Sequence, residues 1–173
     1  MYLFNSCWFF SSEFLLFISE KIPKQLERLK DISRTRNLTD NEVVLQQSLR
    51  EYTDSQFSDL IKKVESAKAI VRSQTFYEID KLEWAVRIFH ETTAAISLVY
   101  NPARISMPPV ETDLTYKPFI SSEILNAVQD TQVNVYRDVF DHILKPAIEA
   151  EKPDVIGISI VLRQQLFSSM TFC

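Results

Sequence analysis

The feature that most constrains this fold is a short apolar run, residues 152–160, which reads KPDVIGISI and contains the only glycine of the 173 residues. Pro153 ends any helix that precedes it, and the β-branched residues that follow favour a strand. A continuous run of such residues is typical of a parallel strand that is buried on both faces. Because a parallel strand requires neighbouring strands and few others are visible in the sequence, we expect this chain to be part of a larger α/β protein.

The scarcity of glycine also constrains the rest of the fold. One glycine in 173 residues is far below the roughly 7% that is usual in proteins. The deficit disfavours glycine-rich phosphate loops and tight hairpins, and so it argues against an independent nucleotide-dependent enzyme. An architecture of long helices, joined by loops that need no glycine, is compatible with this composition. The sequence therefore predicts a mostly α fold with a partial α/β element.

Charge and cysteine content limit the ligands and the cellular compartment that can be expected. The net charge is −4, so no basic surface for nucleic acid is expected. Cys7 and Cys173 are the only cysteines, and two thiols at opposite ends form neither a disulfide framework nor a zinc site. A reduced cytoplasmic protein is therefore the expected setting.

The first nineteen residues are apolar and aromatic, which raises the question of a targeting or membrane segment. The segment lacks a positively charged start and a small-residue cleavage site, and Glu13 interrupts it. It is also shorter than the ~20 apolar residues that a membrane span needs. We expect a buried segment, with a membrane-surface element as the alternative.

Three regions are predicted along the chain. Residues 1–38 are an aromatic segment followed by an amphipathic helix. Residues 39–151 are helical, with a proline-rich loop at residues 101–120. Residues 152–173 are a strand followed by the start of a helix.

Capping signals place the predicted helices in the central region. Thr39 with Glu42, and Thr75 with Glu78, have the spacing of a capping box, and each pair precedes apolar residues at helical spacing. Since few residues separate these two helical stretches, they are expected to pack antiparallel. Ser121 or Ser122 is expected to cap a short helix. A later helix is predicted to open at Thr131, with a kink at Pro146.

No catalytic constellation is visible. The two histidines, His90 and His142, are not spaced for a metal site, and we interpret both as structural residues on helices. The serines lack the context of a nucleophile elbow. A single glycine also excludes the glycine-rich dinucleotide and phosphate-loop fingerprints.

One functional geometry remains, at the carboxyl end of the predicted strand. Ligands of open α/β sheets bind at this edge. Gly157 would let a backbone or a flat ligand approach closely, and Ser159 would offer a hydroxyl group. The alternative is that Gly157 only relieves packing and that Ser159 bonds a backbone group.

The order of these elements resembles the cobalamin-binding domain of B12-dependent radical SAM proteins, in the subgroup whose Rossmann-like domain carries a long helical insertion. Lys152 to Ser159, followed by Gln165-Leu166 at the start of a helix, carries the resemblance. The other similar segments, which together extend it over nearly the whole chain, are Ser11–Leu15, Ala67–Ser73, Phe76-Tyr77, Tyr100–Ser106 and Tyr116–Glu123.

The resemblance implies that this chain binds a cofactor and that another part of the parent protein carries out the chemistry. Cobalamin would bind at the strand, where Ser159 corresponds to a serine near the tail of the cofactor and Gly157 lines the same edge. The parent protein would use S-adenosylmethionine and a 4Fe-4S cluster for methyl transfer or related radical chemistry. The Cys-x3-Cys-x2-Cys motif that binds such a cluster is absent here, so the chain alone is expected to be non-catalytic.

Two kinds of partner follow from these expectations. An internal fragment of a radical SAM protein would pack against the missing radical SAM portion. A stand-alone helical interaction module, the alternative function, would bury its aromatic amino end and residues 153–162 against a partner or a second copy.

Overall fold

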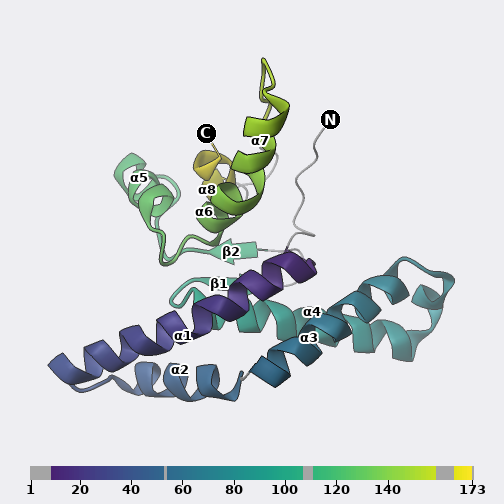
Figure 1. The fold of residues 1–173 in the computed structure, drawn as a ribbon, viewed down its shortest axis with the longest axis horizontal. Helices are drawn as coiled ribbons and strands as arrows, with labels where there is room; N and C mark the ends of the chain where they lie inside the picture. Colours follow the sequence, from purple (N-terminus) through teal and green to yellow (C-terminus); the bar gives the residue numbers. More distant parts are fainter. Residues whose placement is uncertain (1–8, 53, 107–110, 159–165, 173) are drawn as a thin grey trace. The chain divides into compact units, whose positions relative to one another are not determined.

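The computed structural model describes residues 9–52, 54–106, 111–158 and 166–172. Within these ranges the chain is mostly helical, with a small antiparallel sheet of two strands (Figure 1). The described residues divide into two compact units. Unit 1 holds those up to Val99 together with Ser106, and unit 2 holds Tyr100–Ile105 and those from Glu111 onward. The mostly α class is therefore confirmed, whereas the described ranges contain no Rossmann-like sheet.

Unit 1 is a helical bundle. Its elements are α1 (Ser12–Thr35), α2 (Asp40–Glu51), α3 (Asp54–Val71), the 3₁₀ turn η2 (Gln74–Tyr77) and α4 (Ile79–Val99). As expected from the short connection between them, α3 and α4 pack against each other as an antiparallel hairpin (Figure 1). Helix α1 contacts α2, α3 and α4. The side chains in the centre of this bundle include Leu15, Ile18, Leu60, Val64 and Ile96, each at most 1% exposed.

The aromatic amino end belongs to this core from Phe9 onward. Phe9 is 1% exposed, and Phe14 and Leu15 are buried on the inner face of α1. The Ser11 side chain accepts a hydrogen bond from the Phe14 amide and so caps the helix. The expectation of a buried segment is confirmed for the residues that the structure describes.

None of the described helices combines the length and the apolar character that crossing a membrane would require.

The first predicted capping box is confirmed, and it fastens the connection between α1 and α2. The Thr39 hydroxyl accepts a hydrogen bond from the Glu42 amide, and the Glu42 carboxylate accepts one from the Thr39 amide at 2.8 Å. Arg36 donates two further hydrogen bonds to the same carboxylate, at 2.6 and 2.8 Å. The Arg36 guanidinium, assisted by the Thr39 amide, lowers the pKa of Glu42 to about 2.

The second predicted capping box is wrong. Thr75 lies inside η2, where its amide donates to the Ser73 side chain, and α4 begins later, at Ile79. Glu78 instead forms an ion pair with Lys81 at 2.9 Å. The predicted apolar stripe of α4 is buried only in the second half of the helix, since Ile79 is 72% exposed whereas Ile96 is fully buried.

Unit 2 contains shorter elements, although Ser106, the last residue of its first strand, belongs to unit 1. They are β1 (Arg104–Ser106), β2 (Glu111–Asp113), α5 (Ser121–Gln129), α6 (Val135–Val139), the π-helical turn η3 (Phe140–Leu144), α7 (Lys145–Glu151) and α8 (Leu166–Thr171). The two strands pair with each other inside the stretch that the sequence predicts to be irregular. Helices α5 and α8 lie close to their predicted positions, although Ser121 is the first residue of α5 rather than its cap.

The helix after α5 differs from the prediction at its start, and its hydrogen bonding changes just before Pro146. It opens at Val135 with Asn134 as the cap, not at Thr131, which is exposed. Pro146 cannot donate a backbone hydrogen bond, and its ring crowds the carbonyl four residues earlier. The chain widens there into the π-helical turn, in which the Lys145 amide donates to the Phe140 carbonyl.

The predicted buried strand is wrong over the residues that the structure describes. Lys152, with a positive φ of 46°, ends α7, and residues 153–158 belong to no strand. Val155 is 83% exposed, Ile156 54% and Ile158 38%. Strand propensity alone cannot form a strand, because the segment needs neighbours to pair with, and β1 and β2 pair with each other.

Candidate functional site

Of the two residues predicted to hold a cofactor, Gly157 lies within the described residues and Ser159 does not. Gly157 is exposed, and a Cβ atom added to it would meet no atom within 4 Å. No described atom therefore approaches Gly157 closely. Ser159 lies outside the described residues. The space beside Gly157 is open.

Helices of unit 2 flank this segment on both sides in the sequence. Helix α7 precedes it, and α8, which follows it, packs against α5 and α6. The buried residues of α8 are Phe167, Ser169 and Thr171. The segment is thus a connection whose two flanking helices both belong to unit 2.

Asn134 anchors α8 to the rest of unit 2. Its side chain is fully buried, and its amide nitrogen donates to the Thr171 hydroxyl and to the Ala127 carbonyl, both at 2.9 Å. Its side-chain oxygen accepts from the Tyr136 amide at 3.0 Å. A single buried amide thereby connects α5, the start of α6 and α8. An asparagine directly before an apolar helical run is a cap signal that the sequence analysis missed.

Three tyrosine hydroxyl groups connect the stretch after α4 to the helices of unit 2. The hydrogen-bonded pairs are Tyr100 with Asp138 at 2.6 Å, Tyr116 with Asp130 at 2.7 Å, and Tyr136 with Thr112 at 2.7 Å. The partners are between 14 and 38 residues apart in the sequence, so no local pattern could have identified them.

These environments raise the pKa of each phenol. Burial is the main cause for Tyr100, and the negative charge of Asp138 adds to it. The hydrogen bond to Asp130 raises the pKa of Tyr116 to about 12. Burial raises the pKa of Tyr136, although its bond to Thr112 opposes the change. All three groups are neutral near pH 7, where they serve as hydrogen-bonding groups.

Replacing Tyr100 with phenylalanine is expected to lower the free energy of unfolding by about 2 kcal/mol near neutral pH, because it removes a hydrogen bond to a carboxylate. The folded pKa of Tyr100 is raised above the unfolded value near 10. Its contribution is therefore fully present below about pH 10 and is lost as the pH rises further. Urea unfolding measures the free energy of unfolding of both proteins at pH 7 and above pH 10. The difference between wild type and variant should be smaller at the higher pH.

Tyr77 provides the matched control for this experiment. It is 84% exposed, so Tyr77→Phe should change the unfolding free energy little at either pH. A Tyr100→Phe variant as stable as the wild type at pH 7 would contradict the role assigned to its hydroxyl group.

The two histidines lie in different units. His90 is exposed on α4 in unit 1, and His142 is exposed in unit 2, with its Nδ1 atom 3.0 Å from the Asp138 carbonyl oxygen. Among the described residues, no group of three or more histidine, cysteine, aspartate or glutamate side chains is arranged to hold a metal ion.

The surface of unit 1 carries one further candidate for a ligand-binding site. An open hollow of about 610 Å³ lies on α1, lined by Lys24, Glu27, Arg28, Asp31, Ile32 and Thr35. All six residues come from a single helix, so the hollow lacks groups converging from several elements, as ligand sites have.

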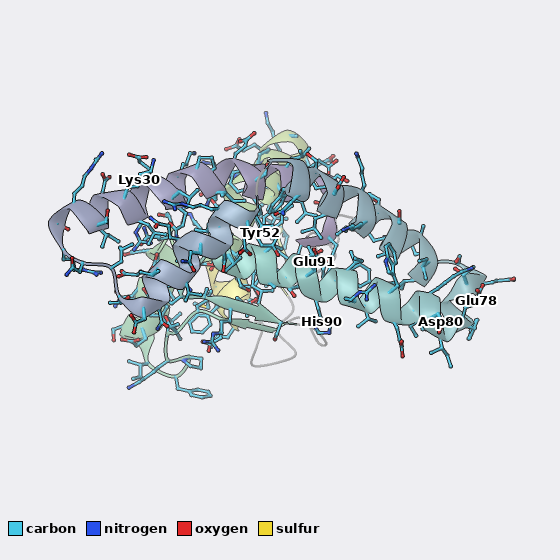
Figure 2. All side chains as sticks on the ribbon, turned by 90° about the horizontal axis from the view of Figure 1, so that it is seen from below. Lys30, Tyr52, Glu78, Asp80, His90 and Glu91 are labelled. Carbon is cyan, nitrogen blue, oxygen red and sulfur yellow. The ribbon has the colours of Figure 1, made fainter. Side chains whose placement is uncertain are left out.

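Two further groups of unit 1 are labelled in Figure 2. Figure 2 shows Tyr52 close to Glu91, and burial followed by the charge of Glu91 raises the pKa of this tyrosine. Figure 2 also shows Glu78 and Asp80 at the outer end of the α3–α4 hairpin, where both are exposed. Neither arrangement combines a binding pocket with a reactive group.

Comparison with protein-family models, with curated proteins and with solved structures finds no match to this chain. Its function is therefore inferred from its own residues.

Proposed function

We propose that this chain is part of the cobalamin-binding region of a B12-dependent radical SAM protein, in which residues 153–158 supply one strand of a Rossmann-like sheet. The observation that carries the proposal is the exposure of apolar side chains on both sides of this segment. Val155 and Ile156 are 83% and 54% exposed. In a strand, adjacent side chains point to opposite faces, so a sheet covered on both faces would bury both residues.

Energetics favour such a covered state. Burying a valine or isoleucine side chain fully contributes about 1.5–3 kcal/mol. Val155 gains little of this in the structure of the chain alone, and Ile156 and Ile158 gain only part of it. Exposed β-branched runs also attract other strands and promote aggregation. Neighbouring strands from the remainder of a larger protein would remove both disadvantages.

The chain would contribute one wall of the cobalamin site. Gly157 has open space beside it, which a flat ring or a backbone could occupy. Ser159 would place a hydroxyl group near the tail of the cofactor, as the resemblance implies. Unit 1 would be the helical insertion. The cluster-binding cysteines and S-adenosylmethionine would belong to the radical SAM portion, in a reduced, cytoplasmic protein.

Titration with hydroxocobalamin tests this function. The expected result is a saturable change in visible absorbance together with a raised melting temperature, because a ligand that binds only the folded state stabilises it. Ser159→Ala should weaken binding severalfold. Ser122→Ala, at an exposed position on α5, is the matched control and should bind as the wild type does. Absence of any saturable change in the wild type would overturn cobalamin binding by this chain.

A second candidate, a stand-alone helical interaction module, is favoured by the self-contained core of unit 1. Leu15, Leu60 and Ile96 are at most 1% exposed without any partner chain. The apolar segment at residues 153–158 would then be covered by a second protein or a second copy. A cooperative melt with no cobalamin response, combined with concentration-dependent self-association in gel filtration, would support this candidate over the first.

A further inference from the structure

We draw no further inference here: the strongest candidate, the exposed apolar patch of Val71, Phe76, Tyr77 and Ile79 at the turn between α3 and α4, carries none because nothing in the structure shows what covers it.

Discussion

Replacing Asn134 with alanine is expected to lower the free energy of unfolding by about 3 kcal/mol and to release α8 from unit 2. The change removes a fully buried amide that makes three hydrogen bonds, two as donor and one as acceptor. It leaves the Ala127 carbonyl and the Tyr136 amide without this partner in a buried place, where unmade hydrogen bonds are costly. Urea unfolding followed by far-ultraviolet circular dichroism measures the loss.

Two further variants separate this anchor from a general effect of removing an asparagine. Asn126→Ala changes an exposed residue of α5 and should alter stability by no more than about 0.5 kcal/mol. Thr171→Val removes one of the partners of Asn134. If the two residues interact as the structure shows, the double variant should lose less than the sum of the single losses. Strict additivity would contradict the bond between them.

Truncating Leu15 to alanine is expected to destabilise unit 1 by about 3 kcal/mol, because the side chain is fully buried and the change leaves a cavity. The adjacent Leu16 is a close internal control, since it is 55% exposed on the same helix. Leu16→Ala should change stability by no more than about 0.5 kcal/mol. Thermal and urea unfolding of the two variants, compared with the wild type, give both values.

This pair tests the assignment of the aromatic amino end to the core. Equal losses from the two variants would mean that α1 is covered on both sides. A larger loss for Leu16→Ala than for Leu15→Ala would place the opposite face of α1 against the bundle. Either result would contradict the packing described for unit 1.

Local signals predicted much of unit 1. The capping box at Thr39 is a short-range pattern, and the helix formed where it predicted. The pattern at Thr75 has the same spacing but fails, because η2 occupies those residues and delays α4 to Ile79. Periodicity alone also misjudged the exposed start of α4, since burial there depends on how far the neighbouring helices extend.

Unit 2 was harder to predict, because long-range contacts hold it together. The bond between Tyr100 and Asp138 spans 38 residues, and that between Asn134 and Thr171 spans 37. Neither residue type nor spacing reveals such pairs. At residues 153–158 the local sequence pattern is clear, but the predicted structure did not form. Its composition predicts a strand, but a strand forms only with a neighbour to pair with, and the described part of the chain supplies none to it.

Hydrogen–deuterium exchange across residues 153–158, with and without hydroxocobalamin, tests most directly the claim that this segment is a strand of a cobalamin site. In the chain alone, we expect its amides to exchange rapidly, whereas the buried helix α1 exchanges slowly. Added hydroxocobalamin should slow exchange in this segment and leave α2 unchanged. Rapid exchange that persists at saturating hydroxocobalamin would contradict the proposed site, as would strong protection of the segment before any ligand is added.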